Sequence, residues 1–359
     1  MNWVRGLLLI FLVLALVVAA GLVTNSTAHG ASLPRHEQVI FNDPTKGDPK
    51  AIQNFVINKV NQQPKGSIVR VAMYSWTMTS ISDALINAYH RGVHIQVVVD
   101  SLAKGQTPYA QLKSVLGSNP NAASYIVGCS SGCVGTNISH IKFVTFNSDN
   151  SVVVSSANFT NIHNWNNAIY FTGYTSLYAA YYHRFVAMKN DAVAHKHGPA
   201  KLLTYSEGDA KLYFYPEARS DNTLLAQLSN ITRCSGTRVD VAVYQFTDAS
   251  VARKLAALKK AGCAVRVALT AIPGYKTTVK NLKGIKVKVI PYDQTNGYLH
   301  SKELLIHGYY SGKMSYLTFM GSINFTSTGL HSNDEDQVKI SNQSIYNQYE
   351  SNFQEIYNG

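Results

Sequence analysis

The chain has 359 residues, of which 46% are hydrophobic and 14% are charged. This composition excludes an intrinsically disordered protein, and the length is sufficient for two hydrophobic cores. The formal net charge of +12 favours anionic partners such as phospholipid headgroups, nucleic acid or cell-surface polymers. The sequence has no dense basic run interleaved with aromatic residues, so it does not indicate a dedicated nucleic-acid groove.

Residues 1–30 have the pattern of a signal peptide. Arg5 precedes an apolar stretch from Gly6 to Val23, and small residues follow it, with Ala28-His29-Gly30 as a cleavage site. The stretch is close to the lower limit for a membrane span, so an uncleaved N-terminal anchor is the alternative. We therefore expect a secreted protein, or one anchored at a membrane surface, with residues 31–50 as a linker.

The segments that follow are repeated. Val71-Ala72-Met73-Tyr74 returns 170 positions later as Val241-Ala242-Val243-Tyr244. Each copy lies in a strand–helix–strand pattern whose helix stops before a glycine, Gly92 or Gly262. This order predicts a parallel or mixed sheet with helices on its faces in each half. The expected strands are 68–73, 93–99, 239–243 and 264–269, and the expected helices are 81–90 and 251–260.

The four cysteines of this chain indicate two disulfides if the protein is exported. Cys129 and Cys133 enclose a short loop, and Cys234 and Cys263 flank the first strand and helix of the second half. We therefore expect the bonds Cys129–Cys133 and Cys234–Cys263. A metal site at the C-x-x-x-C spacing is the alternative, but no neighbouring His/Cys pair completes four ligands, and we expect no metal.

A second repeated motif carries groups suited to chemistry. His140-Ile-Lys142 is followed by Ser-Ser-Ala-Asn158-Phe-Thr, and His300-Ser-Lys302 by Gly-Ser-Ile-Asn324-Phe-Thr. In each copy the His and Lys begin a predicted hairpin, and their spacing of two places both side chains on one face of a strand. A single His-x-Lys is usually an exposed pair without function. Two copies indicate a phosphodiester reaction, which needs a nucleophile or proton donor, a positive charge and a neutral hydrogen-bond donor.

The predicted hairpins also define the two halves. In the first half, 143–146 and 151–154 pair across the turn 147–150, and in the second half 304–306 pairs with 316–320. Residues 190–205 read as the connection between the halves. We expect a first repeat at 51–200 and a second at 201–359.

Together these residues resemble the phospholipase D superfamily, whose signature is H-x-K-x4-D followed by G-S-x-N, given twice per active site. The resemblance covers about Ala51 to Phe353. The cysteine loop and Trp165-Asn166-Asn167 are similar to secreted, mostly bacterial members. The resemblance implies an α/β fold of two tandem repeats, with mixed sheets flanked by helices, related by pseudo-twofold symmetry with the active site at the seam.

The chain departs from the signature at two places. The motif Asp is replaced by Asn147 in the first half and by His307 in the second. The family also has a downstream Glu that orients a catalytic His. In the second half it matches Glu335, which we expect to act on His300. In the first half the same spacing falls on Ile169, with Asn167 as a substitute, so the first half is interpreted as degenerate.

The resemblance further implies a two-step displacement without metal or cofactor. His140 would be the nucleophile that forms a phosphohistidine, and His300 the acid and base, with the exchanged roles left open. The groups that would hold the phosphate oxygens are Lys142, Lys302, Asn158 and Asn324. A monomer can complete such a site, because both motifs lie in one chain.

The expected function is an exported phosphodiesterase of the phospholipase D type that hydrolyses phospholipid headgroups. An exported nuclease of the same fold is the first alternative, favoured by the net charge. A non-catalytic member that binds anions or the cell envelope is the second, motivated by Asn147 and Ile169 in the first motif.

Overall fold

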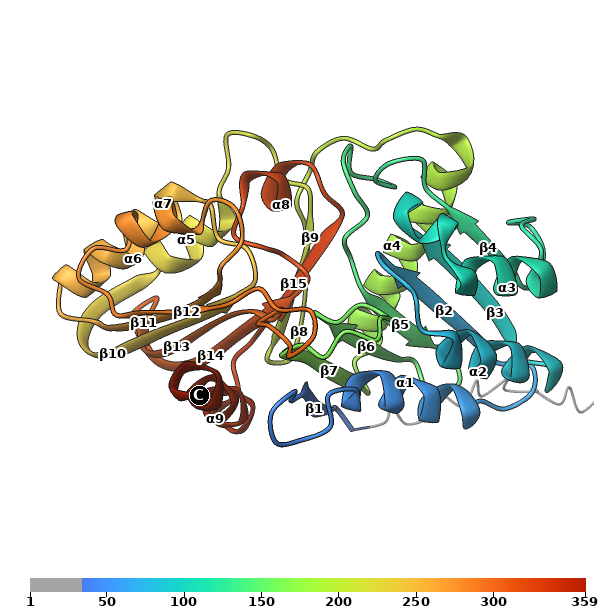
Figure 1. Cartoon of the computed structure of the whole chain (residues 1–359), viewed down its shortest axis with the longest axis horizontal. Helices are drawn as coiled ribbons and strands as arrows, with labels where there is room; N and C mark the ends of the chain where they lie inside the picture. The colour runs from blue at the N-terminus through green and yellow to red at the C-terminus, as the bar shows by residue number, and fades with distance from the viewer. Residues whose placement is uncertain (1–33) are drawn as a thin grey trace, which may run out of the picture. The chain divides into compact units, whose positions relative to one another are not determined.

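The computed structural model describes residues 34–359, so the expected signal peptide and residues 31–33 lie outside the described residues. The described chain forms two mixed β-sheets with helices packed on them (Figure 1). No helix in this part of the chain is both long and apolar enough to cross a membrane.

The first half supplies a seven-stranded sheet. Its strands are β1 (His36–Asn42), β2 (Ile68–Met73), β3 (His94–Val99), β4 (Tyr125–Gly128), β5 (Phe143–Phe146), β6 (Ser151–Ser155) and β7 (Asn166–Thr172). Its helices are α1 (Ala51–Asn61), α2 (Thr79–His90), α3 (Thr107–Leu116) and α4 (Thr175–Ala194), with a 3₁₀ turn, η1, at Ser101–Gly105.

The second half supplies an eight-stranded sheet. Its strands are β8 (Leu203–Glu207), β9 (Ala210–Tyr215), β10 (Ile231–Val243), β11 (Ala264–Thr270), β12 (Val287–Ile290), β13 (Lys302–Tyr310), β14 (Lys313–Gly321) and β15 (Glu335–Ile340). Its helices are α5 (Thr223–Ser229), α6 (Ala249–Lys260), α7 (Tyr275–Asn281), α8 (Ser327–His331) and α9 (Gln343–Asn358).

The two sheets have one topology. The first has the order β1-β7-β6-β5-β2-β3-β4, and the second has β9-β15-β14-β13-β10-β11-β12 with β8 added beside β9. Val71 pairs with Val97 in parallel strands, and Val241 pairs with Val267, so the 170-residue offset is preserved in the register. The predicted strands, helices and hairpins all form, and the sequence repeat is a structural duplication.

The prediction that residues 31–50 form only a linker was wrong. Residues 36–42 form β1, an edge strand antiparallel to β7, in the position that β9 occupies in the second half. The alternation of exposed and partly buried side chains along His36–Val39 suits such an edge, where only one face meets the core. The connection between the halves is also shorter than expected, because α4 continues to Ala194 and β8 begins at Leu203.

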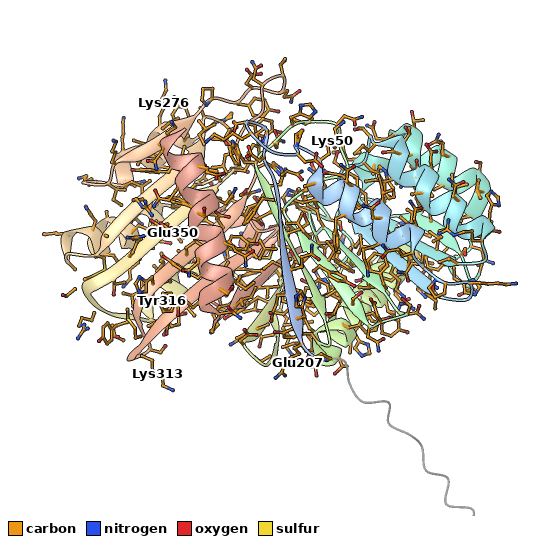
Figure 2. The ribbon with its side chains drawn as sticks, turned by 90° about the horizontal axis from the view of Figure 1, so that it is seen from below. Lys50, Glu207, Lys276, Lys313, Tyr316 and Glu350 are labelled. Carbon is orange, nitrogen blue, oxygen red and sulfur yellow. A yellow bond between two sulfur atoms is a disulfide. The ribbon has the colours of Figure 1, made fainter. Side chains whose placement is uncertain are left out.

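The described residues form three hydrophobic cores, one of which joins the two halves. One core joins the first sheet to α1, α2 and α3, and another joins the second sheet to α5, α6 and α7. The third contains residues of both sheets together with α4 and α9, so the halves share a core. Figure 2 labels Glu350 on α9. Its carboxylate accepts hydrogen bonds from Arg238 at 3.0 Å and Arg266 at 3.4 Å, which ties this helix to β10 and β11.

Both expected disulfides are present. Cys129 is bonded to Cys133 immediately after β4, and Cys234 is bonded to Cys263 between β10 and the start of β11. All four cysteines of the chain are therefore paired.

Candidate active site

The two motifs meet in one cavity at the seam between the halves. The seam is closed by backbone bridges between Ser139 and Asp334 and between Trp165 and Leu299. Next to these bridges lies a cavity of about 530 Å³. His140, Asn158, His300 and Asn324 all line it. The folding of the chain thus brings His140 next to His300, which is 160 residues away in the sequence, and Asn158 next to Asn324, which is 166 residues away.

The His140 ring is held by a carboxylate of the other half. Its Nδ1 lies 2.9 Å from both oxygens of Glu335, the first residue of β15. Burial lowers the pKa of His140 well below 6.5, and the ammonium groups of Lys142 and Lys302 lower it further. A neutral ring that donates Nδ1–H to Glu335 leaves the lone pair of Nε2 free for the cavity.

The partner of His300 differs from that of His140. The Nδ1 of His300 lies 2.9 Å from Oδ1 of Asn166, the first residue of β7. Burial again lowers the pKa of this histidine, followed in effect by Lys302 and Lys142. One histidine is therefore backed by a carboxylate and the other by a neutral amide.

Two expectations about these partners were wrong. Glu335 orients His140 of the first half, and does not act on His300. The substitute for the missing Glu is Asn166, since Asn167 is one position further along β7, points to the other side and donates to Glu303 at 2.8 Å. Counting eleven residues from the motif Asn failed because the loop from Asn158 to β7 is three residues shorter than that from Asn324 to β15.

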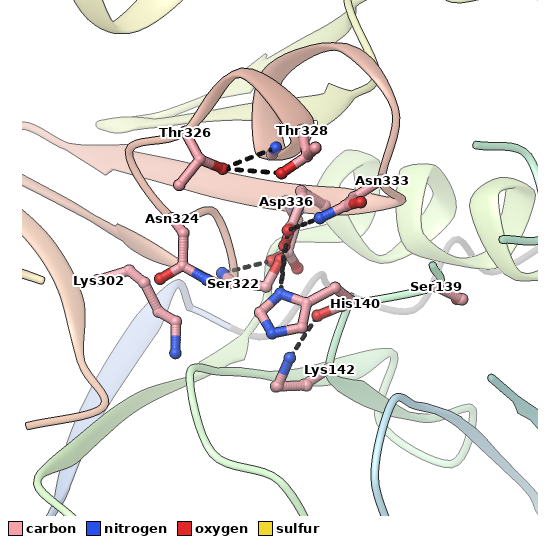
Figure 3. A network of polar contacts seen from close by, with 12 residues as sticks. Ser139, His140, Lys142, Lys302, Ser322, Asn324, Thr326, Thr328, Asn333 and Asp336 are labelled. Atoms are coloured by element: carbon pink, nitrogen blue, oxygen red, sulfur yellow. Dashed lines mark hydrogen bonds and ion pairs between the residues drawn. The ribbon is translucent and has the colours of Figure 1, made fainter. Parts of the chain in front are cut away.

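The two motif lysines are buried beside the histidines. The Nζ of Lys302 lies 3.0 Å and 3.2 Å from the two ring nitrogens of His300, and that of Lys142 donates to the backbone carbonyl of His140. Burial lowers the pKa of Lys142 to about 8, and it lowers the pKa of Lys302 well below 10.5, with repulsion from Lys142 adding to it. Figure 3 shows Lys142, Lys302 and Asn324 arranged around the ring of His140.

The two motif asparagines are held in different ways, Asn324 by its side chain and Asn158 by its backbone carbonyl. Oδ1 of Asn324 accepts the N–H of Gln245 at 3.1 Å, which leaves its Nδ2 group as a donor toward the cavity. The backbone carbonyl of Asn158 accepts a hydrogen bond from Gln53 at 2.9 Å, which fixes that turn. Each asparagine thereby offers an amide at the wall of the same cavity.

Tyrosine side chains form part of the cavity wall, although they lie outside the His-x-Lys and Asn motifs. Tyr74 and its repeat partner Tyr244 both line the cavity. Lys142 lies over the ring of Tyr74 at 5.3 Å, and Lys302 lies over that of Tyr244 at 5.4 Å. The signal for Tyr244 was present in the sequence, because it occupies the position of Tyr74 in the second copy.

Asn147 and His307, which stand where the family signature has Asp, do not line the cavity. Oδ1 of Asn147 accepts the N–H of Ile68 at the start of β2, and the ring of His307 stacks on Tyr316 at 4.4 Å. These positions support the hairpins, so their departure from the signature removes no group from the site.

Residues 34–359 contain no cluster of three or more His, Cys, Asp or Glu side chains that could hold a metal ion. The buried acids near the seam belong to hydrogen-bond networks. Asp336, for example, accepts from Tyr181 at 2.9 Å and from the N–H of Ser322 at 3.0 Å. Burial raises the pKa of Glu335 to about 7 and that of Asp336 to about 6.

Comparison with known proteins agrees with this architecture. The family model described as "Cardiolipin synthase, PLD-like domain" matches residues 61–172 and 228–357, one segment in each half. No curated protein sequence matches the chain.

Two solved structures share the fold. The phosphatidylserine synthase of Haemophilus influenzae Rd KW20 is 12% identical, with a TM-score of 0.61, and the match covers 88% of this chain and 85% of that protein. The polyphosphate kinase of Porphyromonas gingivalis is 15% identical, with a TM-score of 0.59, and covers 88% of this chain. This chain spans about half of the kinase, 49% of its length.

These structural likenesses show the fold, and the family match shows the relationship. The matched segments cover most of both halves, including His140, Lys142, Asn158, His300, Lys302, Asn324 and Glu335. The chain therefore belongs to the phospholipase D-like family that this model describes, within the phospholipase D superfamily of phosphodiester-processing enzymes.

Proposed function

We propose that this protein is an exported phosphodiesterase that hydrolyses the headgroup ester of phospholipids through a phosphohistidine. The observation that carries the proposal is that His140 and His300 line one cavity while their Nδ1 atoms have different partners, a carboxylate and an amide. Two imidazoles in unlike environments are what a displacement with one nucleophile and one proton donor requires.

His140 is the nucleophile in this proposal. Its Nε2 attacks phosphorus, and the bond between phosphorus and the headgroup oxygen breaks. The imidazole becomes positively charged in the intermediate, and the Glu335 carboxylate at 2.9 Å stabilises that charge through Nδ1–H. Burial and two neighbouring lysines keep the free ring neutral, so its lone pair is available before the attack.

His300 is the proton donor and then the base. Its Nε2–H protonates the departing alcohol, and in the second step the same nitrogen takes a proton from water as the water oxygen attacks phosphorus. The electron pair of the P–N bond returns to His140. Burial, followed in effect by Lys302 and Lys142, depresses the pKa of His300 in the protein alone. A bound phosphodiester brings a negative charge that offsets them and favours the protonated ring.

The remaining motif residues bind the phosphate oxygens. Lys142 and Lys302 supply positive charge from buried positions, where an ion interacts more strongly than in water. Asn158 and Asn324 donate neutral hydrogen bonds from the two walls of the cavity. As the oxygens gain charge in the transition state, these four groups stabilise them more than they stabilise the ground state.

The proposal includes the export of the protein. The leader-like residues 1–30 and the two disulfides support a place outside the cytoplasm, where disulfides persist. The net charge of +12 supports contact with an anionic lipid surface.

A nuclease of the same fold is the second candidate. Tyr292 lines the cavity, is 43% exposed and packs against Tyr298 with ring centroids 4.6 Å apart. Aromatic rings at the mouth of a basic site can stack on nucleobases. The same tyrosines also suit a headgroup at a membrane surface, so they are weak support for a nuclease. The leader-like residues 1–30 are stronger support for a phospholipase.

A substrate panel tests the proposal. Residues 31–359 are offered phospholipid vesicles, single-stranded DNA and a small aryl phosphodiester in the presence of a chelator. We expect free headgroup alcohol and phosphatidic acid from the vesicles, and turnover of the aryl diester. Products from DNA alone would establish the nuclease, and no product from any of the three would establish a binding protein.

The pH dependence is a second prediction. The profile of kcat is the relevant one, because it reports the complex, in which the bound diester favours protonated His300. Glu335, whose pKa burial raises to about 7, must be ionised to stabilise the His140 imidazolium, so kcat rises as pH increases through 7. Lys142, whose pKa burial lowers to about 8, must stay protonated, so kcat falls as pH increases through 8. A narrow bell with a maximum between these values is expected from initial rates, with the acid limb absent in Glu335→Gln. A flat profile from pH 5 to pH 9 is incompatible with these roles.

A further inference from the structure

The segment that leads into His140 lies along the segment that carries Glu335. Ser139 and Asp334 form a parallel bridge, and the N–H of Asp334 donates to the carbonyl of Ile138 at 2.9 Å. The first segment comes from the first half and the second from the second half. The relative position of His140 and Glu335 therefore depends on how these two segments hold each other.

Asp334 binds the start of the first segment, at residues 133–135. Its carboxylate accepts three successive backbone N–H groups, those of Cys133 at 2.7 Å, Val134 at 3.1 Å and Gly135 at 2.8 Å. The carboxylate is fully buried and also accepts from Arg184 at 2.7 Å, which balances its charge. Charge-assisted hydrogen bonds of this kind are stronger than neutral ones, so this is a firm contact between the halves.

The residues on either side of Asp334 continue the contact toward the catalytic pair. Asn333 accepts from Asn137 at 2.8 Å and donates to Oε1 of Glu335 at 3.1 Å. Glu335 then accepts from His140. Three consecutive residues, 333, 334 and 335, thus each bind the segment 133–140.

The two segments approach each other too closely for any side chain at Gly135. A Cβ atom there would lie 2.5 Å from the carbonyl oxygen of Ser332 and 2.7 Å from the carbonyl carbon of Asn333. The loop that makes this approach, residues 129–135, is closed by the bond between Cys129 and Cys133, both of which are buried. We call residues 129–135 the cysteine loop.

We propose that the cysteine loop and Asp334 form a positioning device that holds Glu335 against Nδ1 of His140. Asp334 is a positioning residue here, since it contacts neither the ring nor the cavity. The disulfide restricts the loop so that its three N–H groups converge on one carboxylate. This proposal rests on the proposed function, because it assigns to the loop the alignment of the nucleophile in that reaction.

The chain contains its own control for the disulfide. Cys129–Cys133 spans four residues and Cys234–Cys263 spans 29, so loss of the second is expected to destabilise the fold more, since longer closed loops restrict the unfolded chain more. We expect the loss of kcat to be larger for the first disulfide and the loss of Tm to be larger for the second. C129A/C133A should lower kcat by about tenfold or more with KM within twofold, as expected for loss of alignment. C234A/C263A should lower Tm more and leave kcat within twofold.

A glycine pair provides the same test with both disulfides intact. Gly135→Ala pushes the cysteine loop away from Ser332, whereas Gly105→Ala has open space and ordinary backbone angles. We expect the kcat loss of C129A/C133A in the first variant and wild-type kcat in the second. Equal kcat values across all four variants would overturn the proposal, as would a kcat loss that follows Tm. Asp334→Asn is less useful, since it leaves the buried Arg184 charge without its partner.

An assay that needs no turnover separates this proposal from the proposed function. The His140 Nδ1–H that donates to Glu335 is expected to give a downfield proton resonance, protected from solvent exchange, in wild type and in C234A/C263A. It should be lost or exchange rapidly in C129A/C133A and Gly135→Ala. An inactive wild type that shows this pattern refutes only the proposed function. A resonance unchanged in all variants refutes the positioning role, whatever the activity.

Discussion

His140→Ala and His300→Ala are each expected to abolish phospholipid turnover, but for different reasons. Loss of His140 removes the attacking nitrogen, and we expect a fall in kcat on the order of 10⁴-fold or more, as for other covalent nucleophiles. Loss of His300 removes general acid and base catalysis, which contributes roughly 10²–10⁴-fold. The rates are measured with vesicles, and folding is checked by circular dichroism.

The leaving group distinguishes the two roles. An aryl phosphodiester releases a phenolate, which leaves without needing a proton from the enzyme, so His300→Ala should still carry out the first step with it and release one equivalent of phenol in a burst. His140→Ala should give no burst. His163→Ala is the matched control, because this exposed loop histidine follows the first motif and does not line the cavity. A burst in His140→Ala and none in His300→Ala would mean that the roles are exchanged.

Lys302→Met is expected to lower kcat by roughly 10²–10³-fold, the scale seen when one donor to a developing oxyanion is removed. Lys302 is 1% exposed, and in the proposed mechanism its buried ammonium binds the phosphate oxygens. Met keeps the apolar stem and removes a charge that is costly to bury. We therefore expect Tm to be unchanged or higher while activity falls, a combination that thermal melting and vesicle assays reveal together.

Lys142→Met should behave in the same way, because Lys142 occupies the corresponding place beside His140 and is fully buried. Lys276→Met is the control at an exposed position on α7. If Lys302→Met lowered Tm sharply and retained kcat, the lysine would be a structural group, and the proposed binding of phosphate oxygens would be wrong.

Much of the fold could be predicted because the signals are local and occur twice. The 170-residue offset between Val71 and Val241 fixed the equivalence of the halves, and the structure keeps it in the register of their strands. The hairpins that begin at the motifs follow from turn residues and apolar runs. The cysteine pairs could be predicted because Cys129 and Cys133 enclose a short loop, and Cys234 and Cys263 flank the first predicted strand and helix of the second half.

The partners of the histidines could not be predicted in this way. Glu335 and His140 are 195 residues apart, and their contact depends on how the seam closes. Spacing within one repeat assigned Glu335 to His300, since a sequence pattern carries no information about exchange across a seam. Asn166 was missed because the first loop is three residues shorter than the second. The first half does carry an amide in place of the carboxylate, but this replacement affects His300, because Glu335 of the second half binds His140.

The strand β1 was missed for a different reason. His36–Asn42 has mixed polarity and follows the expected signal peptide, and an edge strand buries little apolar surface, so its pattern is weak. The strand is stabilised by its antiparallel backbone pairing with β7, which the polarity pattern of the sequence does not reveal.

The most direct test of the account is to trap the covalent intermediate. His300→Ala is incubated with an aryl phosphodiester labelled in the group that stays on phosphorus, then quenched in alkaline denaturant, because a phosphohistidine is stable there, and digested for mass spectrometry. We expect one label per chain, on the peptide that contains residue 140. A label on any other residue, or a burst of phenol with no label on the protein, would contradict it.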